Sequence, residues 1–193
     1  METDLPVPLS ALTHADTAQL VVIDVQQRLA GAMGSEDRAR VLRNAAILLQ
    51  TAGTLQVPVI ATQQYPKGLG PTEPDVADHL PAQAVRLDKT VFSCCRADGF
   101  NAAVSATGRS QVVLAGMETH VCVLQTALEL HAQGHQVFVV EDACCSRDPA
   151  NASNAARRLR HAGVIVTNTE SVVFEWLGDA RHEAFKALSA LVR

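Results

Sequence analysis

The sequence predicts a three-layer α/β/α domain with a central, mostly parallel sheet of six strands, which is a Rossmann-like arrangement. Two observations lead to this prediction. Short apolar runs alternate with amphipathic stretches, and the runs are hydrophobic on both faces, as parallel strands covered by helices are. No linker and no internal repeat divides the 193 residues, so we expect one domain over residues 1–193.

Six apolar segments are the predicted strands. They are residues 19–26, 57–63, 84–89, 112–115, 136–142 and 164–168. Pro58 lies near the beginning of the second segment, where a missing N–H donor is tolerated. Asp24 lies near the end of the first segment, at the edge where open α/β sheets place their ligands, although it could equally cap a loop.

Helix signals fill the stretches between the strands. The expected N-terminal residues of four helices are Ser35, Asp98, Asp148 and Asp179. Gly53 should end the first of these helices, and Pro149 suits the first position of the third. Two helical pieces, 170–177 and about 180–191, should close the chain, and residues 1–18 read as an N-terminal extension.

The segment 64–75 carries three prolines and two glycines, so we expect it to lack regular structure. Long connections of this kind are often lids or pocket walls, and a mobile insertion without a role is the alternative.

Composition narrows the classes of partner. The formal charge of −4 argues against nucleic acid or an anionic membrane surface, and no apolar run approaches the roughly 20 residues of a membrane span. The first residues lack the basic start and apolar block of a signal peptide. Five cysteines without a Cys-x-x-Cys pair indicate neither a disulfide framework nor a zinc knuckle, so a cytoplasmic protein with a small-molecule substrate is expected.

Three chemically capable residues each follow a predicted strand: Asp24, Lys89 and Cys122. Because such points share one edge of a parallel sheet, the three side chains can converge there. Cys122 falls in the first turn of a helix from about Thr119, where the helix dipole and free N–H groups favour a thiolate and an oxyanion. Asp24 can then accept the thiol proton and Lys89 can support the charge. Polar residues at strand ends are common, however, so spacing alone does not establish a site.

Three segments together resemble the signatures of the isochorismatase-like cysteine hydrolases. They are Val-Ile-Asp-Val-Gln at 22–26, Lys89 before Thr-Val-Phe-Ser, and Gly-Met-Glu-Thr-His-Val-Cys-Val at 116–123. The similarity covers roughly residues 18–178, which we take as the core of the domain. The resemblance implies an Asp24–Lys89–Cys122 triad, a cis peptide between Met117 and Glu118, an oxyanion hole from the N–H groups of Glu118 and Cys122, and a homo-oligomer.

Nicotinamidase-like members of this family carry an Asp-x-His metal motif after the second strand. The same place here reads Thr-Gln-Gln-Tyr-Pro at 62–66, with neither a carboxylate nor an imidazole. We therefore predict no metal and no other cofactor, which disfavours nicotinamide as the substrate. The run from Gln64 to Thr72 instead resembles the isochorismatase domain-containing proteins, for which the resemblance gives fold and triad but not substrate.

The leading hypothesis is a metal-independent cysteine hydrolase that cleaves an amide-type C–N bond or a related bond in a small molecule. The alternative is a non-catalytic binding or scaffold member of the same fold. A third possibility, redox sensing through neighbouring cysteines, would need a resolving thiol that the sequence does not place. The candidate pocket residues are Gln26, Gln63, Tyr65, Phe92 and His120. Gln26 could instead satisfy the end of its strand, and His120 could be structural. We expect Cys94, Cys95, Cys144 and Cys145 to pack as small apolar residues.

Overall fold

The computed structural model describes residues 11–193. Most of the expected N-terminal extension, with Pro6, Pro8 and Ser10, lies outside these residues. Its described end is tied to the domain, because Thr13 is fully buried and its hydroxyl accepts a hydrogen bond from Trp176 Nε1 at 3.0 Å.

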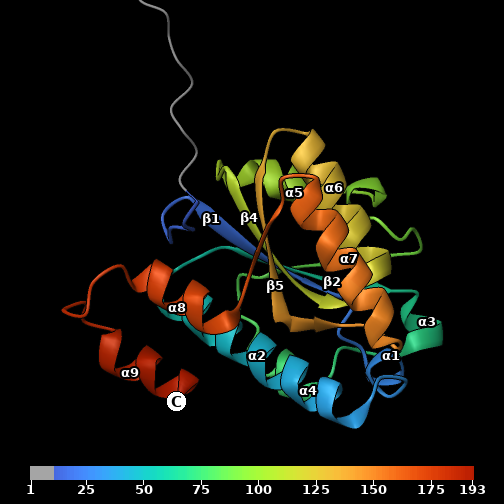
Figure 1. The fold of residues 1–193 in the computed structure, drawn as a ribbon, viewed down its shortest axis with the longest axis horizontal. Coiled ribbons are helices and arrows are strands. Elements are labelled where there is room, and N and C mark those ends of the chain that lie inside the picture. Colours follow the sequence, from blue (N-terminus) through green and yellow to red (C-terminus); the bar gives the residue numbers. More distant parts are fainter. Residues whose placement is uncertain (1–10) are drawn as a thin grey trace, which may run out of the picture.

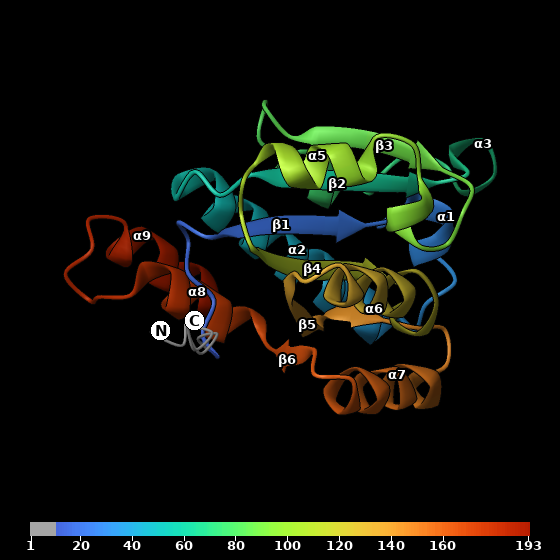
Figure 2. The same ribbon diagram turned by 90° about the horizontal axis from the view of Figure 1, so that it is seen from above.

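The central sheet has six parallel strands in the order β3-β2-β1-β4-β5-β6, which confirms the predicted fold class (Figure 2). The strands are β1 (Ala18–Ile23), β2 (Val59–Gln64), β3 (Val85–Lys89), β4 (Gln111–Met117), β5 (Gln136–Cys145) and β6 (Ile165–Thr167). Strand β1 lies between β2 and β4, so the chain reverses its direction of travel across the sheet there. Such a switch point is where α/β sheets open a crevice for ligands.

Helices cover both faces of the sheet (Figures 1 and 2). On one face lie α2 (Ser35–Thr54), α4 (Pro74–Ala77) and α8 (Thr169–Leu177), with α9 (Phe185–Ser189) against α8. On the other face lie α5 (Phe100–Ala106), α6 (Leu124–Ala132) and α7 (Pro149–His161). The remaining elements are α1 (Gln27–Ala30), α3 (Pro66–Leu69), η1 (Cys94–Arg96), η2 (Thr119–Val123) and η3 (Ala190–Val192). Among the described residues, no helix is long and apolar enough to cross a membrane.

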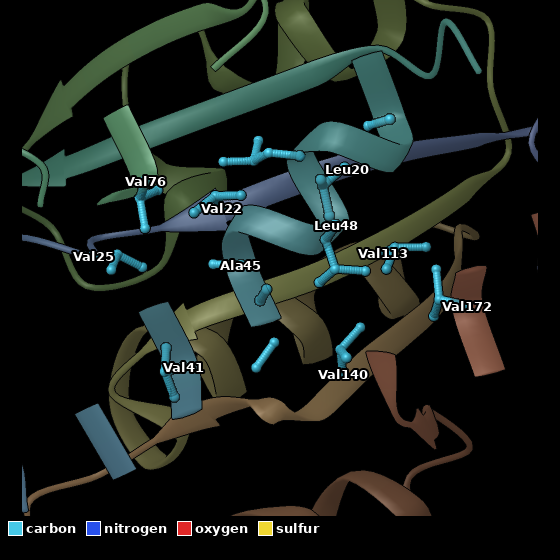
Figure 3. Close-up of a cluster of buried hydrophobic side chains, with 14 of the residues drawn as sticks. Leu20, Val22, Val25, Val41, Ala45, Leu48, Val76, Val113, Val140 and Val172 are labelled. Atoms are coloured by element: carbon cyan, nitrogen blue, oxygen red, sulfur yellow. The ribbon is translucent and has the colours of Figure 1, made fainter. Parts of the chain in front are cut away.

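Alternation along β1 explains how one strand supports both layers. Leu20 and Val22 join the cluster beneath α2, where Leu48 also packs (Figure 3), and Val21 and Ile23 join the cluster beneath α5 and α6. All four of these strand side chains are at most 2% exposed. Burial of each contributes roughly 1.5–3 kcal/mol, so the strand that carries Asp24 at its end is firmly fixed.

Several helix ends differ from the sequence predictions. Helix α2 continues through Gly53 to Thr54, because a glycine inside a helix costs only about 1 kcal/mol and packing outweighs it. Gly99, at φ 80, precedes α5 in place of Asp98. Asp179 binds Arg181 instead of starting a helix, and α9 begins later, at Phe185.

The segment 64–75 is more regular than predicted. It contains the single-turn helix α3 and the start of the single-turn helix α4, and Pro66 and Pro74 each occupy the beginning of one. Proline suits this position because its missing N–H would have no partner inside the helix and its φ is already helical. The prediction of no regular structure was therefore wrong for these two turns.

Gly116 allows β4 to approach β1 closely at the point where both strands end. It pairs with Ile23, has φ +132, and a Cβ added to it would lie 2.0 Å from the Ile23 carbonyl oxygen. Both the backbone conformation and the space therefore require glycine. Because of this close approach, Asp24, which directly follows β1, lies beside the turn that follows β4.

We expect Gly116→Ala to destabilise the protein by more than about 3 kcal/mol, because the added methyl group meets backbone that cannot move aside. Gly134→Ala is the matched control, since Gly134 also has a positive φ, +91, but has no atom within 4 Å of the position that a Cβ would occupy. This control should lose only about 1–2 kcal/mol. Urea unfolding midpoints measure both, and equal losses would contradict the close-contact explanation.

Candidate active site

The three chemically capable residues meet at the carboxyl end of the sheet. Asp24 directly follows β1, Lys89 is the last residue of β3, and Cys122 lies in η2, just beyond β4. Lys89 Nζ lies 2.6 Å from Asp24 Oδ2 and 3.6 Å from Cys122 Sγ. The side chains of Asp24 and Lys89 have no exposed surface, and Cys122 is 5% exposed. The structure therefore brings the predicted residues together in a nearly closed site.

The Asp24 carboxylate is held from two sides. Its second oxygen, Oδ1, accepts a hydrogen bond from Thr62 Oγ1 at 2.7 Å, and the Asp24 N–H donates to the Thr62 carbonyl at 3.1 Å. Asp24 also has φ 53, a left-handed conformation that is uncommon outside glycine. Thr62 thus fixes both the backbone and the side chain of Asp24, a role that the sequence did not reveal.

The Lys89 ammonium group has acceptors on all sides. Besides Asp24 and Cys122, it donates to Gln64 Oε1 at 2.7 Å and faces the carbonyls of Phe92 at 3.2 Å and Val91 at 3.3 Å. Burial acts to lower the pKa of Lys89, but the charge of Asp24 and the two nearby sulfur groups raise it above its usual value. Lys89 is therefore a stable cation beside Cys122.

The segment 117–123 forms an irregular turn around Cys122. The Met117–Glu118 peptide is cis, and η2 has π-helical spacing, with the Glu118 carbonyl accepting from the N–H groups of Val121 at 3.1 Å and Val123 at 3.3 Å. The Glu118 carboxylate accepts from Arg147 N at 2.9 Å and Nε at 3.1 Å. These bonds anchor the turn to the segment that follows β5.

The protonation state of Cys122 differs from the sequence expectation. Burial, the charge of Asp24 and a hydrogen bond to Asp24 raise the pKa of the Cys122 thiol to about 12, and the Lys89 charge offsets only part of this. The start of a helix was expected to favour a thiolate. In the closed site, desolvation and the neighbouring carboxylate outweigh that effect, so the resting residue is a thiol with a base beside it.

The other cysteines are buried and free, as predicted. Cys94 lies nearest to the site, with Sγ 3.9 Å from Thr62 Oγ1. Burial and the charge of Asp24 raise the pKa of its thiol to about 11. Cys94 therefore packs as a neutral group behind the carboxylate.

Two of the candidate pocket residues act as anchors of the segment 64–72. Gln26 is fully buried, and its amide nitrogen donates to the carbonyls of Gly70 at 2.7 Å and Gln64 at 3.1 Å. Gln63 donates to Asp88 at 3.1 Å and accepts from Thr72 N at 2.9 Å. The side-chain amides of Gln26 and Gln63 are thus engaged with the protein itself, and the Gln26 amide binds Gln64 at the end of β2 and Gly70.

The remaining candidate pocket residues are Tyr65, Phe92 and His120, of which the first two are exposed. Tyr65 and Phe92 are 54% and 55% exposed, and His120 Nδ1 lies 2.9 Å from Ser146 Oγ. Tyr65 lines a cavity of about 480 Å³ beside the end of β3, together with Thr90 and Lys89. The side chains of Lys89 and Asp24 have no exposed surface, so the cavity lies next to these two residues without opening onto them.

The place of the metal motif in related enzymes is used differently here. The side-chain amides of Gln63 and Gln64 both form hydrogen bonds with neighbouring protein groups. Within residues 11–193, no group of three or more His, Cys, Asp or Glu side chains is arranged to hold a metal ion.

Comparison with known proteins identifies the family. The family model described as "Isochorismatase domain" matches residues 18–171. The chain belongs to the isochorismatase family. It is 41% identical over 155 residues to isochorismatase domain-containing protein 2 of Bos taurus, covering 80% of this chain and 74% of that protein.

Solved structures of this family share the fold over nearly the whole chain. The MAR1 ribonuclease of Caenorhabditis elegans has a TM-score of 0.87 and 32% identity, covering 94% of this chain and 92% of that chain. YcaC from Escherichia coli, described as an octameric hydrolase of unknown specificity, has a TM-score of 0.86 and 26% identity over 93% of this chain and 88% of that chain. The isochorismatase-like fold is therefore shown, as is membership of a family that contains hydrolases.

The raised pKa of Cys122 predicts an unusual pH profile for its alkylation. With a pKa of about 12 the thiolate fraction should grow about tenfold per pH unit up to at least pH 10.5. An ordinary thiol levels off above about pH 9. Iodoacetamide labelling, read at the Cys122 peptide by mass spectrometry, measures this, and the urea-unfolded chain is the control. A plateau below pH 8 in the folded protein would contradict the buried-thiol assignment.

Proposed function

We propose that this isochorismatase-family protein is a cysteine hydrolase that cleaves an amide-type C–N bond, or a related bond, in a small molecule without a metal ion. The observation that carries the proposal is the contact of Lys89 Nζ with both Asp24 Oδ2, at 2.6 Å, and Cys122 Sγ, at 3.6 Å. A nucleophile, a base and a cation within bonding reach of one another are what acyl transfer requires.

The protonated thiol assigns the first step to Asp24. As Cys122 Sγ attacks the carbonyl carbon, its proton passes to the Asp24 carboxylate, and the carbonyl π electrons move to oxygen. When the C–N bond breaks, its electron pair goes to nitrogen, which takes the proton from Asp24. The leaving amine departs and a thioester remains on Cys122. A carboxylate accepts about four hydrogen bonds, so Asp24 can serve as base while it holds Thr62 and Lys89.

Water completes the cycle by the same route. Asp24 takes a proton from water as the oxygen adds to the thioester, and collapse of the adduct returns the proton to the departing sulfur. Lys89 stays charged throughout and offsets the negative charge that moves between Asp24 and Cys122. The developing oxyanion is assigned to the backbone N–H groups of Glu118 and Cys122, the first just before η2 and the second within it.

The substrate is proposed to be a small molecule. A ribonuclease, the activity named for the worm relative, has to hold a polyanion, and this chain has a formal charge of −4. The nucleophile is also only 5% exposed, which suits a compact substrate better than a polymer. The octameric state described for YcaC supports a homo-oligomer here as well.

A non-catalytic binding member of the family is the second candidate. One observation favours it, because a closed site with a protonated thiol is also what an inactive member would show. The two candidates differ in what Asp24 does, since only a hydrolase needs its carboxylate as a base.

Asp24→Asn should separate the two candidates by moving two rates in opposite directions. Loss of the carboxylate removes a charge that raises the pKa of Cys122, so alkylation at pH 8 should accelerate about tenfold or more. Loss of the base should lower turnover by about 10²-fold or more. A faster thiol with unchanged turnover would rule out Asp24 as the general base.

Cys122→Ala should abolish turnover while the protein remains folded, because Cys122 supplies the bond-forming atom but packs as a small side chain. A panel of amides, ureides and vinyl ethers, assayed with the wild type and this variant, measures the activity, and thermal unfolding checks the fold. Activity that survives in Cys122→Ala on a confirmed substrate would overturn the mechanism. Absence of turnover across the panel, together with no acyl adduct on Cys122, would favour the binding protein.

A further inference from the structure

We propose that Gln64 is a positioning residue for the Lys89 ammonium group and that Gln26 holds Gln64 in place. The inference rests on the proposed function for its catalytic meaning, but its geometry stands on the contacts of these side chains alone. Neither residue belongs to the Asp24–Lys89–Cys122 triad.

The first step is the number of partners around Lys89. An ammonium group has three N–H donors, and five acceptors lie within reach of it. The two shortest contacts are Asp24 Oδ2 at 2.6 Å and Gln64 Oε1 at 2.7 Å. Gln64 therefore takes one of the three donors and restricts how the other two divide between Asp24, the loop carbonyls and the sulfur.

The orientation of the Gln64 amide is fixed by a second bond. Its Nε2 donates to the Thr90 carbonyl at 2.7 Å, which leaves Oε1 facing Lys89. A flipped amide would place NH₂ against the ammonium group and lose both bonds. A neutral acceptor at this point stabilises the cation without adding a second negative charge beside Cys122.

Gln26 supports Gln64 through the backbone. Gln26 Oε1 accepts from Gln64 N at 2.7 Å, and Nε2 donates to the Gln64 carbonyl at 3.1 Å. The Gln26 N–H in turn donates to the Asp24 carbonyl at 2.9 Å. Hydrogen bonds thus connect Asp24, Lys89, Gln64 and Gln26 in a closed ring. The ion pair is held by Gln64 and Gln26 as well as by its own attraction.

Gln64→Glu tests the charge part of the inference. A carboxylate in place of the amide should draw the Lys89 ammonium away from the sulfur and add a negative charge near Cys122. The titratable groups that already face Cys122 are the Asp24 carboxylate, the Lys89 ammonium and the neutral Cys94 thiol. Alkylation of Cys122 at pH 9 should slow about tenfold. The control is Gln111→Glu at the opposite end of the sheet, where a buried glutamine amide also joins chain segments. It should stay within about twofold of the wild type, and equal rates in both variants would overturn the proposal.

Gln64→Ala tests the positioning part by a spectroscopic readout and does not depend on how well the acidic variant folds. The chain has three lysines, and Lys67 and Lys186 are exposed. In protein labelled with ¹⁵N-lysine, the buried Lys89 ammonium should give a slowly exchanging signal, identified by its loss in Lys89→Arg. Gln64→Ala should shift this signal and speed its proton exchange about tenfold or more, whereas Gln111→Ala should leave it unchanged.

Gln26→Ala should change the Lys89 signal in the same direction as Gln64→Ala and by less. An unchanged signal in Gln64→Ala would overturn the role of Gln64, and an unchanged signal in Gln26→Ala alone would overturn the role of Gln26. Neither readout needs a substrate. If turnover is never found, the proposed function fails while this inference is still decided; if Cys122 proves to be the nucleophile and the Lys89 signal ignores Gln64, only the inference fails.

Discussion

The buried ion pair between Lys89 and Asp24 is the interaction on which the site depends. Removing two charges from water costs several kcal/mol for each, and their attraction repays this only when the remaining donors and acceptors are satisfied. Both side chains have no exposed surface here. Thr62 and Gln64 supply the further bonds, so the ends of β1, β2 and β3 are all committed to stabilising this one pair.

The same ion pair also affects the protonation state of Cys122. Burial and the charge of Asp24 both raise the pKa of the Cys122 thiol, and the charge of Lys89 offsets only part of this, so the neutral thiol is favoured. A permanent thiolate would be exposed to oxidation and to chance electrophiles, because reactivity follows thiolate character. A thiol beside a base avoids this, since the thiolate arises only as the bond to the substrate forms. In the proposed mechanism, the low exposure of Cys122 and its raised pKa thus both protect the thiol from unwanted reactions.

The fold and the three residues that meet at its edge could be predicted from the sequence because both follow from local patterns. Apolar runs mark parallel strands, and Asp24, Lys89 and Cys122 each stand at or just beyond the end of such a run, where the strand ends of a parallel sheet meet. The ends of helices were predicted less well. Gly53 stays inside α2 and Pro66 begins α3, since packing and position within the turn decide what a glycine or a proline does.

Thr62 and Gln64 could not be recognised in advance for a related reason. Their types are ordinary at the end of a strand, and their importance comes from what lies beside them after β1 and β3 have paired with β2. Alternation would have given a hint, because residues 62 and 64 share one face of β2 and Gln63 the other. That face points to Asp24 and Lys89, and the opposite face to Asp88 and Thr72. The buried charges of Asp24 and Lys89 could therefore be predicted from the sequence. The residues that bind them, Thr62 and Gln64, could be recognised only from the three-dimensional structure.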